Sequence, residues 1–354
     1  MKGNREDCLL RISLALGTRQ NTIREILLSV NDPQKLIDEG ARYQLPVYGE
    51  VIESINRVRE DDVVRMRESM DEDGIGVLSI LDEGYPPLLK SIIDPPGILF
   101  VKGQSEIISR PSVCMVGSRI ATMEGMSIAE IIAGDLAREG LVVVSGLARG
   151  IDQAAHRGAL NVGGKTTAIL GCGPDIMYPR VCRREYGRVA REGAILSEFP
   201  PGTEPRRAYF PRRNRIMSGM SMGVVVVEAA ARSGALITSN YALEEGREVF
   251  AVPGSPLNPL SRGTNGLIKQ GAIPVETGND VIEALKLSGW LRKRKLGSEG
   301  CGDFMKLLQG GPKSIDELAR LTGREASQLL SELLEMEVNG NVERLPGMRY
   351  VCRG

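Results

Sequence analysis

The 354-residue sequence has little of the chemistry on which most metal sites and secreted proteins depend. It contains a single histidine, His156, one tryptophan and six cysteines, which occur singly and never as a CxxC pair. Zinc sites need clustered cysteine and histidine ligands, so we expect no metal site. Isolated cysteines in a chain that opens without a hydrophobic signal segment favour reduced thiols and a cytoplasmic location.

Long hydrophobic runs and a net charge are also missing. Apolar stretches such as residues 224–227 are far too short to cross a bilayer, so we expect no membrane partner. The 45 lysines and arginines balance the 45 aspartates and glutamates, but unevenly. Residues 178–215 contain ten arginines against four glutamates, and five of the fourteen aromatic residues. Because the rigid guanidinium group suits phosphate oxygens, this segment indicates an anion-binding surface.

The distribution of apolar, proline and charged residues predicts five segments. Residues 1–75 form an N-terminal helical domain, since leucine and isoleucine recur there at helical spacing. Residues 76–110 form a proline-rich, irregular but apolar lead-in that packs on the core, because paired prolines interrupt helices. Residues 111–289 form a Rossmann-like domain, 290–301 a basic and glycine-containing linker, and 302–354 a winged-helix domain.

The Rossmann-like domain alternates short apolar runs with helix-length amphipathic segments. The runs lie at residues 113–116, 142–144, 167–170, 194–196, 224–227 and 249–252. Strands that are apolar on both faces and alternate with helices are typical of a parallel-rich sheet in an α/β protein. Most runs end in small residues, for example Gly117-Ser118 and Ser145-Gly146. Since ligands bind at the carboxyl ends of such strands, we expect a site there.

The last segment combines the features of a helix-turn-helix and a hairpin. Ser314 and Glu317 make a capping box, leucines between residues 329 and 334 mark a second helix, and residues 342–351 predict a hairpin that turns at 346–347. Residues 324–337 carry four glutamates and one arginine. A DNA duplex repels such a helix, so we interpret this unit as a protein-contact or regulatory module.

The tripeptide Gly117-Ser118-Arg119 follows a buried strand and precedes a helix. Glycine permits close backbone approach, and the amides of the following helix attract phosphate. An ordinary tight turn with a solvated arginine explains the pattern equally well. Two other motifs fail as nucleotide sites: Lys165 lies in an incomplete P-loop in which strand and helix have the wrong order, and residues 171–173 lack the third glycine of a dinucleotide fingerprint. We therefore expect no cofactor.

Residues 209–215 make the most unusual stretch, because three arginines and an asparagine follow two aromatic rings. Phosphate pairing combined with stacking surface suits a single nucleic-acid strand, whose bases are exposed. Tyr209 or Phe210 would stack a base, although either ring could instead belong to the core. Loops at 233–238 and 263–265 either hold a phosphate or only cap helices.

Catalytic groups are harder to find. His156 follows Asp152 at helical spacing, and a structural histidine is the favoured interpretation over a catalytic one. The sequence offers no paired carboxylates and no nucleophile–base pair, so we expect a protein that is not an enzyme.

Several of these stretches together resemble the DprA (Smf) family of DNA-processing proteins of bacterial natural transformation. The matching stretches are YPPLL (85–89), DPP (94–96), VGSR (116–119), SGLARGID (145–152), AH (155–156), GCGPD (171–175), YP (178–179), SEFPPG (197–202), FPRRNRI (210–216), SGALIT (233–238), GREVFAVPG (246–254), SRGTN (261–265) and GA (271–272). They occur in order over about 190 residues, which is far more specific than any single motif.

The resemblance implies an extended Rossmann-like domain that binds single-stranded DNA, forms a homodimer and helps to load the RecA recombinase. It also implies strand contacts by Arg119, Lys165 and Arg213. With the residues singled out above, the expected DNA-binding set is Gly117, Ser118, Arg119, Gly146, Lys165, Tyr209, Phe210, Arg212, Arg213, Asn214, Arg215, Gly254 and Asn265.

Two alternatives remain open at this point. A Rossmann-like enzyme or sensor could bind a small nucleotide in the same place, with Glu228 or Glu198 against the ribose. The extended arginine run argues against it, because a mononucleotide offers too few phosphates. A winged-helix transcription factor is disfavoured by the acidic helix at 324–337.

Overall fold

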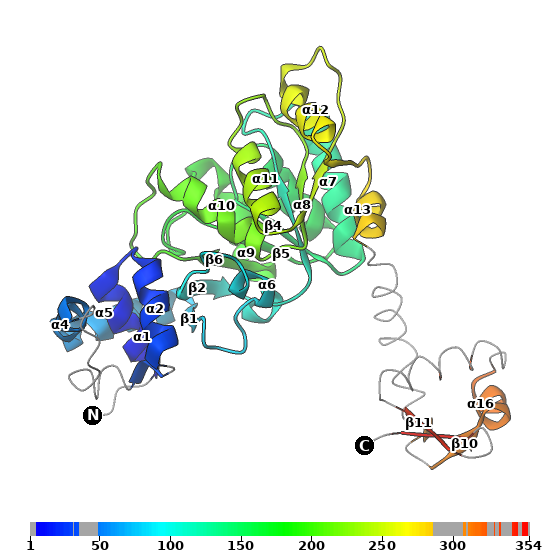
Figure 1. The fold of residues 1–354 in the computed structure, drawn as a ribbon, viewed down its shortest axis with the longest axis horizontal. Helices are drawn as coiled ribbons and strands as arrows, with labels where there is room; N and C mark the ends of the chain where they lie inside the picture. Colours follow the sequence, from blue (N-terminus) through cyan, green and yellow to red (C-terminus); the bar gives the residue numbers. More distant parts are fainter. Residues whose placement is uncertain are drawn as a thin grey trace. The chain divides into compact units, whose positions relative to one another are not determined.

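The computed structural model describes residues 5–30, 32–34, 49–285, 307–308, 311–323, 329, 333, 342–345 and 349–352 (Figure 1). The chain divides into two compact units, Met1–Leu285 and Lys286–Gly354, which are considered separately. Within the residues described, no helix has the length and apolar character needed to span a membrane.

A nine-stranded sheet forms the centre of the described part of the first unit, in the order β1-β2-β6-β5-β4-β3-β7-β8-β9. Its strands are β1 (Ile75–Ser79), β2 (Ile98–Gly103), β3 (Ser112–Val116), β4 (Val142–Ser145), β5 (Thr166–Ile169), β6 (Ala194–Ser197), β7 (Gly223–Val226), β8 (Glu248–Ala251) and β9 (Ile273–Pro274). Strands β3 to β9 are parallel, whereas β1 and β2 add an antiparallel edge next to β6. The predicted parallel-rich α/β fold is confirmed.

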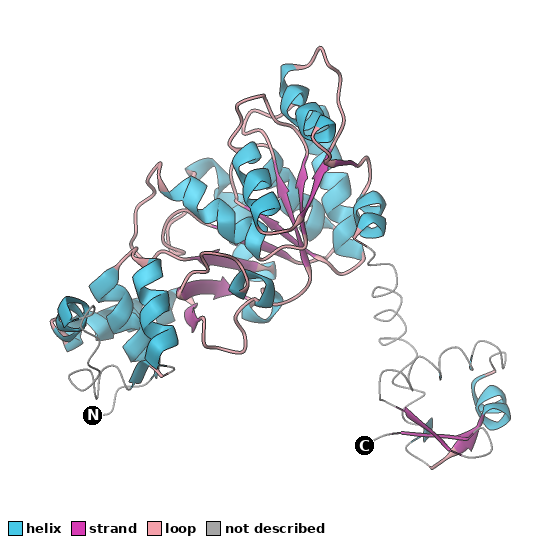
Figure 2. Ribbon diagram, viewed as in Figure 1, coloured by secondary structure: helices cyan, strands magenta, loops and turns pink. Residues whose placement is uncertain are grey.

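Helices cover both faces of this sheet (Figure 2). The helices of the α/β part are α6 (Pro87–Lys90), α7 (Met123–Arg138), α8 (Ile151–Asn161), α9 (Arg183–Glu192), α10 (Tyr209–Gly219), α11 (Ala235–Glu244), α12 (Arg262–Lys269) and α13 (Gly278–Ala284). Short 3-10 turns are η1 (Ser105–Ile107), η2 (Arg180–Cys182) and η3 (Pro259–Ser261). Helix α7 packs beside α8 and α13, and α8 beside α9, whereas α10 packs beside α11 and α6.

The lead-in differs from its prediction. Instead of an irregular segment, it supplies β1 and β2, and the first four residues of β2, Ile98 to Val101, are buried. The prolines that suggested irregular structure lie between these two strands rather than in them. Antiparallel pairing with β6, which is distant in sequence, stabilises β2, and local residue preferences do not report such pairing.

In the described part of the N-terminal segment, the helices that precede the sheet include α1 (Arg5–Leu16), α2 (Gln20–Val30), α4 (Gly49–Asn56) and α5 (Glu60–Asp73). Their buried side chains, among them Ile12, Ile23 and Val63, belong to the same apolar cluster as β2 and part of the central sheet. The predicted boundary at residue 75 therefore falls inside a continuous core, and a separate N-terminal domain stays a prediction.

The second unit has its own small core. Strands β10 (Lys313–Ser314), β11 (Val342–Leu345) and β12 (Arg349–Cys352) form a sheet in the order β10-β12-β11, next to helix α16 (Ile315–Thr322). The predicted capping box is present, since Glu317 N donates to Ser314 Oγ at 3.2 Å and Ser314 N to Glu317 Oε2 at 2.8 Å. The antiparallel pairing of β11 with β12 confirms the hairpin. The linker at 290–301, the turn at 346–347 and most of the acidic helix at 324–337 lie outside the described residues.

Candidate nucleic-acid interface

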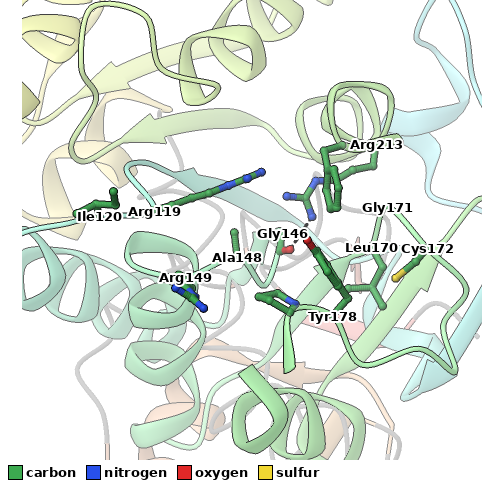
Figure 3. A pocket seen from close by; sticks show the side chains of 12 residues that line it. Arg119, Ile120, Gly146, Ala148, Arg149, Leu170, Gly171, Cys172, Tyr178 and Arg213 are labelled. Atoms are coloured by element: carbon green, nitrogen blue, oxygen red, sulfur yellow. Dashed lines mark hydrogen bonds between the residues drawn. The ribbon is translucent and has the colours of Figure 1, made fainter. Parts of the chain in front are cut away.

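Two adjoining cavities open at the carboxyl ends of the central strands. The direction of the strand order reverses at β3, with β4 to β6 on one side and β7 to β9 on the other, which is where open α/β sheets place their ligands. The cavity volumes are about 280 and 680 Å³, and Figure 3 shows the smaller one. Both cavities are lined by Arg119, Ile120, Ala148, Tyr178, Phe210 and Arg213.

The turn between β3 and α7 presents one free arginine to these cavities. A Cβ atom on Gly117 would lie 2.5 Å from Ile151 Cγ1, so glycine is needed for α8 to pack against the turn. The backbone N–H of Ser118 donates to Glu228 O at 2.7 Å and fixes the turn to β7. Arg119 is exposed, extends across the cavity (Figure 3) and has no carboxylate partner among the described residues. Its guanidinium is therefore free to bind a phosphate.

Arg213 provides a second, buried positive charge. Only 4% of the residue is exposed, and its Nη1 donates to Gly146 O at 2.5 Å and to Ile169 O. Its Nη2 lies 3.9 Å from Asp152 Oδ2. Burial lowers the pKa of Arg213, and the neighbouring Asp152 carboxylate opposes this effect. Arg213 thus forms the floor of the site, and a direct contact with phosphate stays a prediction.

Gly146 is required by this arrangement. A Cβ atom at Gly146 would lie 2.1 Å from Arg213 Nη2. Because Arg213 is buried, its guanidinium has little room to move away from the added atom. The same Arg213 side chain donates through Nε to Asn214 Oδ1 at 3.0 Å, so Asn214 orients it from the other side. Gly146 and Asn214 both belong to the predicted set, and both serve to hold the buried guanidinium.

The two rings of residues 209–210 have different surroundings. Tyr209 stacks on the buried ring of Phe199, with centroids 4.3 Å apart and 27° between the ring planes. Phe210 lies between the cavities, 5.6 Å from the centroid of Tyr178 and 5.6 Å from Cζ of Arg119. Of the two rings that the sequence left open, Phe210 lines the cavities and Tyr209 packs against the protein, and stacking of a base on Phe210 stays a prediction.

Three arginine or aromatic residues that line the cavities were missing from the predicted set. Tyr178 is 43% exposed and faces Phe210, Arg149 lines the smaller cavity, and Arg207 lines the larger one. A signal for each was present in the sequence. Tyr178 and Arg207 lie in the basic segment at 178–215, and Arg149 is the arginine of the SGLARGID stretch.

Arg212 and Arg215 both have a carboxylate partner within the protein. Neither is among the residues that line the cavities. Both donate to the same oxygen, Oε2 of the buried Glu198, at 2.9 Å from Arg212 Nη2 and 2.7 Å from Arg215 Nη2. The charge of a buried carboxylate has to be compensated, and these two arginines provide that compensation for Glu198. A contact of either arginine with phosphate stays a prediction.

Lys165 also lies away from the cavities. It precedes β5, so it is at the amino edge of the sheet, whereas both cavities open at the carboxyl edge. The four residues of β5 separate the two edges by about 13 Å at 3.3 Å per residue. Lys165 Nζ donates instead to the Glu192 carbonyl at 3.1 Å. Lys165 therefore lies at the opposite edge of the sheet from the cavities, and its contact with a bound strand stays a prediction.

Gly254 and Asn265 contact each other. Asn265 Nδ2 donates to Gly254 O at 2.8 Å, and Gly254 N donates to Asn265 Oδ1 at 3.2 Å. Neither is among the residues that line the two cavities. This pair fixes the loop after β8, and a direct role in binding stays a prediction.

Glu228 and Glu198, the two carboxylates considered for a nucleotide enzyme, both have partners within the protein. Glu228 accepts from the Thr122 hydroxyl at 2.6 Å and from Thr122 N at 2.9 Å, which supports the start of α7. Glu198 pairs with its two arginines. Burial raises the pKa of the Cys172 thiol, which lines the smaller cavity, to about 12, so it stays protonated near neutral pH. His156 is fully buried against β5 rather than in the site.

Together these features define a class: an α/β protein with a Rossmann-like sheet whose switch point holds an arginine- and aromatic-lined cavity. The model of the family DNA recombination-mediator protein A matches residues 76–286, and that of the DprA winged helix domain matches residues 304–348. The chain belongs to the DprA/Smf family.

The similarity extends to individual relatives. DNA processing protein DprA of Streptococcus pneumoniae is 48% identical over 204 residues, which cover 58% of this chain and 72% of the relative. Protein Smf of Escherichia coli is 40% identical over 286 residues, covering 76% of each chain. The crystal structure of the S. pneumoniae protein superposes with a TM-score of 0.68 at 37% identity, over 80% of this chain and 98% of that one.

A second relative of known structure is described as binding single-stranded DNA. The structure of DNA processing protein A from Helicobacter pylori, described for its unique single-stranded DNA binding mode, has a TM-score of 0.54 and 29% identity. It covers 60% of this chain and 95% of that chain. The similarity of the fold therefore extends to a relative that binds a single strand.

Proposed function

We propose that this protein is a single-stranded DNA-binding recombination mediator that binds the strand at the two adjoining cavities. The observation that carries the proposal is the free guanidinium of Arg119, placed against the ring of Phe210 and opposite Tyr178. Guanidinium groups bind phosphate, and rings stack on bases. A single strand exposes both groups at once, whereas the bases of a duplex are stacked on each other.

The arginines around the cavities favour a strand over a mononucleotide. Arg119, Arg149 and Arg207 are all exposed at the rim, and Arg213 adds its charge from below. One nucleotide has too few phosphates to reach all of them. The carboxylates proposed for a nucleotide enzyme are buried in structural contacts, which also favours binding without catalysis.

The wider role follows from the family. We propose that a homodimer joins two such sites on one strand, which raises the effective affinity without new contacts at either site. We further propose that the bound strand is passed to RecA in the cytoplasm. The family assignment, and the relative described for its single-strand binding mode, support this role.

The test is fluorescence anisotropy with a labelled oligonucleotide over a range of salt concentrations. Wild type is compared with Arg119→Ala, Phe210→Ala and the control Arg57→Ala, which removes an exposed arginine just after the end of α4. We expect Arg119→Ala to lower affinity and to make the slope of log K against log salt shallower by about 0.7, the value for one phosphate contact with a single strand.

Phe210→Ala should behave differently from Arg119→Ala. It should lower affinity by about 1–3 kcal/mol, the contribution of one stacked base, with an unchanged salt slope. Arg57→Ala should match wild type. Weak binding of the oligonucleotide together with efficient displacement by a mononucleotide would refute the proposal in favour of a nucleotide enzyme or sensor.

A further inference from the structure

Helix α10 supplies one wall of both cavities, because Phe210 and Arg213 belong to its first half. Two neighbouring arginines hold the helix from its other side. Arg212 and Arg215 share the Glu198 carboxylate, whose side chain is completely buried at the end of β6. Glu198 therefore helps to hold α10 in place, and with it the ring of Phe210 and the guanidinium of Arg213.

The same anchor continues into the segment before β2. Arg215 Nη1 donates to Asp94 O at 2.5 Å, and Arg215 Nε lies 3.4 Å from Asp94 Oδ2. The other carboxylate oxygen of Asp94 is 2.6 Å from Nη1 of Arg24, a residue of α2. Arg24 Nη1 also reaches Pro95 O at 3.3 Å. Asp94 thus joins an arginine of α10 to an arginine of α2.

A second residue of α2 reaches Glu198 itself. Gln20 is 1% exposed, and its Nε2 donates to the backbone oxygen of Glu198 at 2.7 Å. Its Oε1 accepts from Ile98 N at 3.1 Å. A Cβ atom at Gly97 would lie 2.6 Å from Arg24 N, so the backbone of this segment packs directly on α2. The amide of Gln20 and the guanidinium of Arg24 are therefore part of one partly buried polar network.

From this network we infer that α2 positions the DNA-binding wall, with Gln20 and Arg24 as positioning residues that act through Asp94 and Glu198 on α10. The inference rests on the proposed function. The inference assigns a role to α2, which lies before residue 76, where the match to the family model begins. Neither residue is among those that line the cavities, so the effect is transmitted by the network and not by contact with the strand.

The experiment compares Arg24→Ala with the matched control Arg11→Ala in the full chain. Arg11 pairs with Glu60 inside the helical part and has the same 17% side-chain exposure as Arg24, but it does not contact the network. We measure the affinity for a labelled single strand over a range of salt concentrations. We also measure hydrogen exchange of the backbone amides of α10. Arg24→Ala should weaken binding about 3- to 10-fold, within the range of mutations that couple sites at a distance. The salt slope should stay unchanged, and α10 should exchange faster.

Arg11→Ala should leave affinity within about 2-fold of wild type and leave α10 exchange unchanged, because sites without shared partners act independently. Arg24→Lys, which can keep the ion pair with Asp94, should recover most of the lost affinity. If Arg24→Ala does not fold, Gln20→Ala replaces it with the same expectation.

Three results would overturn the inference. Unchanged affinity in Arg24→Ala would exclude the positioning role, and equal losses in Arg24→Ala and Arg11→Ala would show general destabilisation. A salt slope shallower by about 0.7 in Arg24→Ala would show that Arg24 contacts a phosphate directly. Failure of wild type to bind the strand would instead refute the proposed function, so the two failures can be told apart.

Discussion

His156 should make the folded protein sensitive to mild acid, and it is the chain's single histidine. Its Nδ1 lies 2.7 Å from Thr166 Oγ1, and the Thr166 hydroxyl donates to Val143 O at 2.6 Å. The hydroxyl oxygen therefore accepts from Nδ1–H, which leaves the lone pair on Nε2. Nε2 has no hydrogen-bond partner within the described residues. Burial, and then the charge of Arg213, lower the pKa of His156 to about 3.

The lowered pKa of His156 sets the sign and the size of its effect on the pH dependence of stability. The unfolded chain binds a proton near pH 6.5, whereas the folded protein resists it until about pH 3. The contribution of His156 to the free energy of unfolding is therefore fully present above pH 6.5 and is lost as the pH falls below that value. Between pH 7.5 and 5.5 the loss from this residue is about 1.4 kcal/mol.

Glu245 acts in the opposite direction over the same range. Burial raises the pKa of its carboxyl to about 7, so acidification favours the folded state through this group. The pH dependence of wild type alone therefore mixes two effects of opposite sign. A comparison with a variant that lacks the imidazole separates them.

The assay is urea unfolding followed by far-UV circular dichroism at pH 7.5 and 5.5, for wild type and His156→Asn. The asparagine amide can replace Nδ1 at Thr166 but does not titrate. Wild type should lose about 1.4 kcal/mol relative to the variant on going to pH 5.5. A difference between the two proteins that is the same at both pH values would refute the argument, and His156→Gln provides a second variant if the asparagine is not tolerated.

Two further changes test the packing beneath the site. Gly146→Ala should cost about 1–3 kcal/mol in thermal or chemical unfolding, because the added methyl group meets Arg213 Nη2 at 2.1 Å. Gly266→Ala is its control, since nothing lies within 4 Å of the added carbon, and equal effects in both would contradict the argument. Glu198→Gln should destabilise by about 3–5 kcal/mol, because it leaves two arginines without their buried counter-charge. A change below about 1 kcal/mol in chemical unfolding would show that solvent compensates them.

The sequence by itself predicted the six strands β3 to β8, the edge of the sheet at which the cavities open, and two of the side chains that line them. Buried parallel strands are continuous apolar runs, and this local property marked residues 113–116 and 142–144 without any tertiary information. The small residues after those runs indicated where the loops converge. Arg119 and Phe210 followed from residue type and from motifs whose backbone requirements are local.

Only the tertiary structure decided which arginines are free. Arg119 and Arg215 carry the same charge, but Arg215 meets Glu198 and Asp94, which are 17 and 121 residues away in sequence. Lys165 suited phosphate by type, yet its place before β5 puts it at the opposite edge. Likewise, β2 depends on pairing with β6. Whether a charge is neutralised and whether a strand is paired depend on long-range contacts, and no local pattern in the sequence reports them.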